Sequence, residues 1–218
     1  GAIGSETLSG TTWEDANGDG VFDTPAEAGL GGVTLTLTVT TSINASTPAL
    51  TFSASSGGAG SPNYSFSNLP PGTYQLSVTG RPLGYALSTA ATRSGSLPAV
   101  GQTFGLYRSA TIGDLVWLDL NGNGTYESGV DQGFPGMTVR LRNATTDAIA
   151  ASTTTASNGS YAFENVAPGT YRIEFAAPAG VEPVNDGLGS LTVNNDNDAY
   201  QTGKPNRTDD FVIVSNQI

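Results

Sequence analysis

The sequence contains no cysteine and no histidine among its 218 residues. These absences exclude disulfide bonds, thiolate or imidazole metal ligands, and the Ser-His and Cys-His pairs that activate catalytic nucleophiles. Charged residues make up only 12% of the chain, and the net charge is −11. The eight basic residues are scattered and form no basic cluster, so we do not expect a nucleic-acid-binding protein. The absence of Cys and His also makes an enzyme the least expected class.

Long apolar runs are also missing. No segment approaches the roughly 18 apolar residues that a membrane-spanning helix requires. The chain begins at Gly1 without a signal-like apolar segment, so we interpret it as a processed or trimmed piece. Glycine and proline are abundant instead, with 29 and 12 residues, and Thr, Ser, Val and Ala dominate the rest. This composition is typical of short strands and turns, and the length is sufficient for two domains of about 100 residues each.

The chain contains an internal repeat. A first set of residues recurs 104 positions later: Trp13, Asp15, Asn17, Gly20, Gly29, Gly32 and Thr34. A second set recurs 97 positions later: Tyr64, Phe66, Asn68, Pro71, Gly72, Thr73 and Tyr74. The difference between the two spacings places seven extra residues in the first copy, and we assign them to a loop in the Ser/Gly-rich segment 44–61. The repeat predicts two domains of one fold, residues 1–109 and 110–218.

Strand patterns are legible in both copies. In the first copy, Val33, Leu35, Leu37 and Val39 alternate with threonines, and in the second, Met137, Val139 and Leu141 alternate with Thr138, Arg140 and Arg142. Such period-2 alternation indicates strands with one buried face, and no segment shows a helical stripe. The prediction is an all-β fold with a small sandwich in each half. The apolar run Phe211–Val214 is expected to close the second sandwich. Alternatively, a terminal segment completes a neighbour's sheet by strand addition, as in the subunit of a filament.

Negative charge is concentrated between Trp13 and Glu27, which hold five of the six acidic residues in the first 113 positions. Crowded carboxylates raise one another's pKa unless a counter-charge holds them together. The spacing is that of a calcium loop, with ligands predicted at Asp15, Asn17, Asp19, the carbonyl of Val21, Asp23 and Glu27. Glu27 comes one position later than the bidentate glutamate of the usual loop. The alternative interpretation is an ordinary polar turn built on Asn-Gly and Asp-Gly.

A second loop repeats this pattern, including the late carboxylate. Its predicted ligands are Asp119, Asn121, Asn123, Thr125, Glu127 and Asp131. Three carboxylates replace four, which predicts weaker calcium binding. Asp196 and Asp198 lie in an Asp- and Asn-rich segment that follows Gly180, and they are either further calcium ligands or part of a solvated polar loop.

Two other groups of residues favour structural interpretations. Trp13 and Trp117 end their opening strands at equivalent repeat positions, so we expect core packing rather than stacking on a sugar. Glu164 and Glu174 alternate with apolar neighbours, so we expect surface charges rather than the carboxylate pair of a glycosidase.

The repeated motifs resemble the B-type repeats of serine-aspartate-repeat surface proteins of Gram-positive bacteria and related adhesin modules. The resemblance is carried by the Trp-x-Asp-x-Asn-x-Asp/Asn-Gly loop, the Gly-Leu/Phe-x-Gly before the next strand, the Asn-x-x-Pro-Gly-Thr-Tyr corner and the Asp-rich segment of the second copy, over most of residues 8–107 and 112–213. It implies tandem immunoglobulin-like or prealbumin-like β-sandwiches. Some related modules carry an isopeptide bond, but Lys204 is the only lysine, which argues against one here.

The resemblance also implies a role. It points to a calcium-stiffened, non-enzymatic spacer or building block outside the cell, whose partners are neighbouring domains or copies of itself in a surface structure or fibre. The alternative is an adhesin segment in which the loops at 44–61 and 180–208 bind a host protein, a matrix ligand or a glycan.

Overall fold

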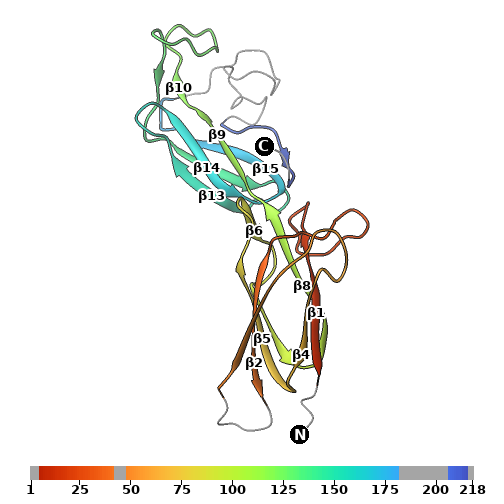
Figure 1. Ribbon diagram of the computed structural model, residues 1–218. Coiled ribbons are helices and arrows are strands. Elements are labelled where there is room, and N and C mark those ends of the chain that lie inside the picture. The colour runs from red at the N-terminus through yellow and green to blue at the C-terminus, as the bar shows by residue number, and fades with distance from the viewer. Residues whose placement is uncertain (1–4, 42–47, 182–205, 216–218) are drawn as a thin grey trace. The chain divides into compact units, whose positions relative to one another are not determined.

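The computed structural model describes residues 5–41, 48–181 and 206–215. Within these ranges every regular element is a β-strand, and none of them contains a helix that could span a membrane. The chain divides into two compact units, the first running to Ser109 and the second starting at Ala110 (Figure 1). The all-β fold of two tandem immunoglobulin-like or prealbumin-like sandwiches is confirmed.

Unit 1 consists of two four-stranded sheets, with strand orders β4-β1-β8-β6 and β3-β2-β5-β7. The strands are β1 (Glu6–Glu14), β2 (Thr34–Thr41), β3 (Leu50–Ser55), β4 (Tyr64–Leu69), β5 (Gly72–Gly80), β6 (Tyr85–Leu87), β7 (Thr92–Ser96) and β8 (Ala99–Arg108). β1 pairs with β4 in antiparallel and with β8 in parallel orientation. The remaining strand pairs of this unit are antiparallel.

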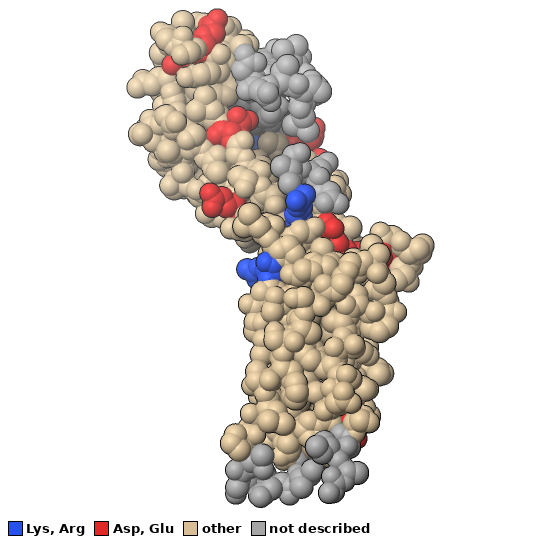
Figure 2. Space-filling model, viewed as in Figure 1, with Lys and Arg blue, Asp and Glu red and all other residues tan. Residues whose placement is uncertain are grey.

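The core of unit 1 lies between these sheets, as the alternation along β2 predicts. Val33, Leu35, Leu37 and Val39 are all 0% exposed, while the threonines between them point to the other face. The opposite sheet contributes Leu8, Phe104 and Leu106 to the same cluster. In the view of Figure 2, the visible surface of unit 1 shows almost no charged side chains between its two ends.

The prediction of a loop at residues 44–61 is wrong for the middle part of that segment. Leu50–Ser55 forms β3, which pairs in antiparallel orientation with β2. Phe52 and Ala54 pack against the core, so this strand does alternate. Its polar positions are occupied by Thr and Ser and its inward positions include a small Ala, which gives a weak hydrophobic period in the sequence.

Unit 2 has one four-stranded sheet, β13-β12-β15-β16, and two two-stranded sheets, β14-β9 and β10-β11. The strands are β9 (Ala110–Leu115), β10 (Trp117–Leu118), β11 (Gln132–Gly133), β12 (Thr138–Asn143), β13 (Ile149–Thr154), β14 (Ser160–Val166), β15 (Gly169–Ala176) and β16 (Phe211–Ile213). Val139, Leu141 and Ile173 are among the buried residues of its core. Phe211–Ile213 pairs with β15, so the apolar run near the end completes one sheet of this unit, as predicted.

The repeated Asn-x-x-Pro-Gly-Thr-Tyr motif forms the same corner in both units. Asn68 and Asn165 each have a φ of 57°, a left-handed conformation that asparagine tolerates better than most residues. Gly72 follows in the first corner, and a Cβ there would lie only 2.1 Å from the carbonyl oxygen of Thr40. The motif therefore encodes backbone geometry, which explains why it recurs.

Candidate metal-binding loops

The first acidic loop connects β1 to β2 and is organised by its two buried carboxylates. Asp15 is 0% exposed and accepts hydrogen bonds from the N–H groups of Gly18 at 2.6 Å and Gly20 at 2.7 Å. Glu27 is 7% exposed and accepts hydrogen bonds from the N–H groups of Ala16 at 2.8 Å and Asp23 at 3.0 Å. A buried carboxylate needs such partners, so these two side chains hold the backbone of the loop in a fixed path. The late position of Glu27 thus has a structural reason.

Three exposed side chains of the same loop meet at one point. The Nδ2 group of Asn17 donates hydrogen bonds to Oδ2 of Asp19 at 3.1 Å and to Oδ2 of Asp23 at 3.2 Å. Asp19 also accepts the N–H of Val21 through Oδ1 at 2.8 Å, which fixes the direction of its carboxylate. Two carboxylate oxygens therefore face the neutral amide NH2 of Asn17, whose own oxygen accepts the N–H of Asp19 at 3.0 Å. The two carboxylates are of the type that a hard divalent cation such as calcium prefers.

The second loop follows β10 and has the same plan. Asp119 accepts hydrogen bonds from the N–H groups of Gly122 and Gly124, both at 2.7 Å. Asp131 is 8% exposed and accepts the N–H of Leu120 at 3.1 Å and of Glu127 at 2.7 Å. Asp119 and Asp131 thus correspond to Asp15 and Glu27.

The exposed side chains of the second loop also converge, with less charge. Glu127 takes the place of Asp23, and its Oε2 accepts hydrogen bonds from Nδ2 of Asn121 at 2.5 Å and of Asn123 at 3.1 Å. Thr125 corresponds to Val21 and donates its N–H to Oδ1 of Asn123 at 2.8 Å. One carboxylate and two amides meet here, compared with two carboxylates and one amide in the first loop. The electrostatic attraction for a cation is therefore weaker in the second loop.

The protonation state of Asp119 reflects these contacts. Burial is the largest single influence and by itself raises the pKa of Asp119. Backbone hydrogen bonds from Gly124, Gly122, Asn123 and Asn121 together outweigh it and hold the pKa below the usual value for an aspartate. The residue is therefore an anion at neutral pH.

Each loop is attached to its unit by an aromatic contact. Phe22 lies against Trp13 with ring centroids 5.2 Å apart, and Tyr126 lies against Trp117 with centroids 5.8 Å apart. The sequence analysis did not identify Phe22 and Tyr126 as the residues that attach the loops. They are separated by the repeat spacing of 104 positions, which is the signal that could have identified them. Trp13 is only 2% exposed, which confirms core packing, whereas Trp117 stays partly exposed.

The structure does not test several of the predicted site residues. Asp196, Asp198 and Lys204 fall outside the described residues, as does most of the predicted binding loop 180–208. Within the described ranges, no group of three or more Asp and Glu side chains is arranged to hold a metal ion. The loops instead combine carboxylates with asparagine amides, so calcium binding by them stays a prediction.

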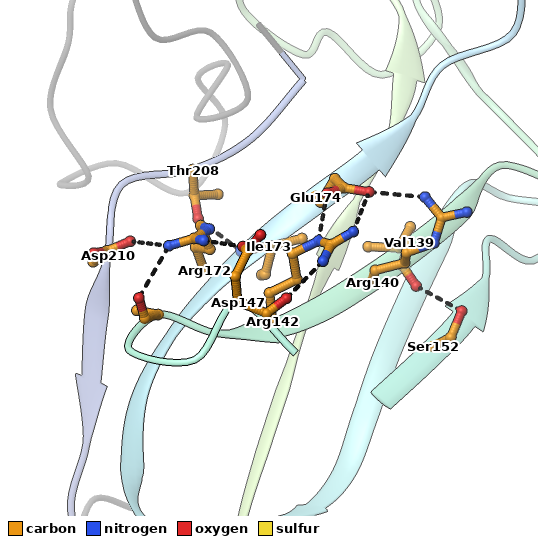
Figure 3. A network of polar contacts seen from close by, with 11 residues as sticks. Val139, Arg140, Arg142, Asp147, Ser152, Arg172, Ile173, Glu174, Thr208 and Asp210 are labelled. Atoms are coloured by element: carbon orange, nitrogen blue, oxygen red, sulfur yellow. Dashed lines mark hydrogen bonds and ion pairs between the residues drawn. The ribbon is translucent and has the colours of Figure 1, made fainter. Parts of the chain in front are cut away.

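A network of charged side chains occupies the outer face of β12 and β15 in unit 2 (Figure 3). Glu174 accepts hydrogen bonds from Arg140 at 2.8 Å and from Arg142, while Arg172 contacts Asp147 and Asp210. The hydrogen bond from Arg142 is the main reason why the pKa of Glu174 lies below its usual value. Glu164 lies on β14, in the other sheet, so it forms no carboxylate pair with Glu174.

Comparisons with known proteins agree with the repeat. The family model of the SdrD B-like domain matches residues 6–98 and 110–217. Serine-aspartate repeat-containing protein D of Staphylococcus aureus (strain Newman) is 29% identical over 234 residues, which cover 99% of this chain and 17% of that protein. Serine-aspartate repeat-containing protein F of Staphylococcus epidermidis is 31% identical over 221 residues, which cover 93% of this chain and 12% of that protein. The chain therefore spans less than a fifth of the length of these relatives.

Among solved structures, the shaft pilin SpaA from Lactobacillus rhamnosus GG is similar with a TM-score of 0.37 and 13% sequence identity. The match covers 83% of this chain and 91% of that chain.

Proposed function

Because the chain belongs to the SdrD B-like domain family, we propose that it is a calcium-stabilised structural module of a bacterial surface protein or fibre. Its role is mechanical rather than catalytic, and it acts outside the cell as a rigid spacer or building block. Its partners are the neighbouring domains or copies of itself.

The observation that carries this proposal is that buried and exposed side chains have different roles within the two loops. Buried carboxylates, Asp15 and Glu27 in the first loop, hold the backbone, and the exposed carboxylates of Asp19 and Asp23 converge on the amide of Asn17. An ordinary polar turn needs neither a second set of carboxylates nor a repeat of the same geometry 104 positions later. The arrangement is therefore better explained as a cation site than as a turn.

The residues of the loop also explain how a bound ion could stiffen the module. Calcium supplies positive charge that offsets the repulsion between the exposed carboxylates. Asp19 and Asp23 then stay together, and the segment between them contains Phe22, which contacts the buried Trp13. A loop held in one conformation thereby keeps Phe22 packed against Trp13 in the core of the unit. Without disulfides, this is the cross-link available to the fold.

Calcium binding is tested by isothermal titration calorimetry on the 218-residue chain and on loop variants. Asp23→Asn removes one of two converging carboxylates and should weaken the tighter site, whereas Glu127→Gln should weaken the other. Glu164→Gln is the matched control, because Glu164 is exposed and lies on β14, outside both loops. Equal calcium binding by all four proteins would show that the loops are only turns.

A further inference from the structure

The chain contains four Asn-Gly pairs, and three of them lie in the acidic loops. The pairs begin at Asn17, Asn121, Asn123 and Asn158. In such a pair the backbone nitrogen of the glycine can attack Cγ of the asparagine, because glycine has no side chain that hinders the approach. The new bond between this nitrogen and Cγ closes a five-membered cyclic imide, and the side-chain nitrogen leaves as ammonia. Water then opens the imide to give aspartate or isoaspartate.

All four pairs share one local conformation. The side-chain oxygen Oδ1 of each asparagine accepts the N–H of the residue two positions later, at 2.8 to 3.1 Å. This hydrogen bond folds the side chain back over the following peptide. The four glycines also agree, with φ between 73° and 84°. The pairs are therefore matched in sequence and in local geometry, so differences in their reactivity come from their surroundings.

In the acidic loops the attacking nitrogen is held by an anion. The N–H of Gly18 donates to Asp15 at 2.6 Å, and the N–H groups of Gly122 and Gly124 both donate to Asp119 at 2.7 Å. The nitrogen loses this proton when it reacts, and negative charge then develops beside a carboxylate. Like charges this close repel each other strongly, so the cyclic imide forms slowly in the loops.

The fourth pair lies in the turn between β13 and β14, and its surroundings differ. The N–H of Gly159 donates to the neutral carbonyl oxygen of Ala156 at 2.9 Å. Oδ1 of Asn158 accepts two hydrogen bonds from Ser160, one from the N–H at 3.1 Å and one from the hydroxyl at 2.7 Å. Negative charge develops on this oxygen when Cγ is attacked, and two donors directed at it stabilise that charge as an oxyanion hole does.

We propose that Asn158 is a self-modification site of the folded chain, which is converted to aspartate and isoaspartate through the cyclic imide, whereas the asparagines of the acidic loops are protected. Water is the only co-reactant, and Asn158 is exposed to it. This inference goes beyond the proposed structural role and does not depend on calcium.

The modified turn lies against the segment that leads into the second acidic loop. The carbonyl oxygen of Gly159 accepts the N–H of Val116 at 2.9 Å, and the carbonyl oxygen of Val116 accepts the N–H of Phe134 at 2.8 Å. A Cβ on Gly133 would lie 2.0 Å from the carbonyl oxygen of Asn158, so the turn is closely packed. Isoaspartate adds one carbon to the backbone between residues 158 and 159 and displaces the Gly159 carbonyl. The modification therefore loosens the start of β10.

The test is peptide mapping by mass spectrometry of the full 218-residue chain, incubated at neutral pH in a calcium chelator, with and without denaturing urea. In the folded chain we expect amide loss at Asn158 to be at least about tenfold faster than at Asn17, Asn121 or Asn123. In urea the four rates should become similar, because the pairs no longer differ in their surroundings. Hydrogen exchange of the Val116 amide should become faster as isoaspartate accumulates at position 158.

Two variants separate the effect of the Ser160 hydroxyl from a general effect on the turn. Ser160→Ala removes one of the two donors to Oδ1 and should slow amide loss at Asn158 about tenfold in the folded chain but not in urea. Ser157→Ala is the matched control, because it removes an exposed hydroxyl of the same turn and should leave the rate unchanged.

Three outcomes would overturn the proposal. They are equal rates at the four pairs in the folded chain, a faster rate in either loop than at Asn158, and the same rate in Ser160→Ala as in the wild-type chain. An unchanged exchange rate of Val116 in the isoaspartate form would refute the loosening of β10. Since chelator is present throughout, each of these results is independent of whether the loops bind calcium.

Discussion

Replacing Asp15 by alanine should destabilise unit 1 even without calcium, and by more than the equivalent change at Asp119 destabilises unit 2. Asp15 is 0% exposed and accepts two backbone hydrogen bonds at 2.6 and 2.7 Å. A hydrogen bond to a charged group contributes about 1.5–3 kcal/mol. The variant loses both bonds but also avoids the cost of burying a carboxylate, so we expect a loss of about 3 kcal/mol.

The comparison with Asp119 makes this prediction sharp. Asp119 accepts three backbone hydrogen bonds, one more than Asp15, so bond counting alone predicts the larger loss in unit 2. Because Asp119 is partly exposed, water can replace the carboxylate in Asp119→Ala, and we expect a loss of about 1 kcal/mol.

Differential scanning calorimetry of the full chain in chelator measures both effects, with hydrogen exchange of amides in each unit to assign the transitions, because two units need not unfold in one step. Asp15→Asn keeps one side-chain oxygen as an acceptor and should fall between the wild-type chain and Asp15→Ala. A loss for Asp119→Ala as large as that for Asp15→Ala would refute the claim that burial decides the role of these carboxylates.

Further predictions concern the closing strand and the charged network. Gly105→Val should destabilise unit 1 by about 1–3 kcal/mol in urea denaturation, because its side chain would collide with Trp13, whereas the control Gly58→Val, where an added Cβ meets no atom within 4 Å, should change stability little. Glu174→Gln should destabilise unit 2 by about 1 kcal/mol in the same assay, since two arginines lose their anionic partner, while Glu164→Gln should leave stability unchanged. The folded-state pKa of Glu174 is below its unfolded value, so its contribution is present above an unfolded pKa of about 4.3 and is lost as the pH falls through the folded pKa. Acid titration of Glu174→Gln should therefore show a weaker loss of stability below about pH 4.3 than that of the wild-type chain.

Several features of the fold were predictable from sequence because each leaves a local pattern. Leu35 and Leu37 alternate with threonines, and the corner at Asn68 recurs at Asn165 with the same left-handed φ of 57°. β3 was not found because its Ser and Ala residues blur the period of 2. A period is visible only where inward and outward residues differ clearly in polarity.

The loops show a second limit of sequence reasoning. The spacing predicts one set of ligands, but the structure divides that set into buried carboxylates that bind backbone N–H groups and exposed groups that converge. Asp15 and Asp19 are the same residue type four positions apart, and only their burial separates their roles. Burial depends on contacts distant in sequence, such as the bond between Asp15 and Leu106, so the spacing alone does not reveal it.

The place of the last described strand in its sheet likewise required the structure. The sequence predicts a strand at Phe211–Val214, and residues Phe211–Ile213 form β16. Only the pairing of Thr170 with Val212 shows that this strand corresponds to β7 rather than to β8. Register between strands is a tertiary property, so the sequence of a strand does not show which partner it takes.

The most direct test of the account is thermal unfolding of the 218-residue chain in calcium and in chelator. Ligand that binds only the folded state at about a hundred times its dissociation constant stabilises by about 2.7 kcal/mol. For a unit of about 100 residues this corresponds to an increase in Tm of roughly 10 °C or more. We predict such an increase with calcium, its loss on adding chelator, and a smaller increase in Asp23→Asn. A Tm that is the same in calcium and in chelator would contradict the central claim.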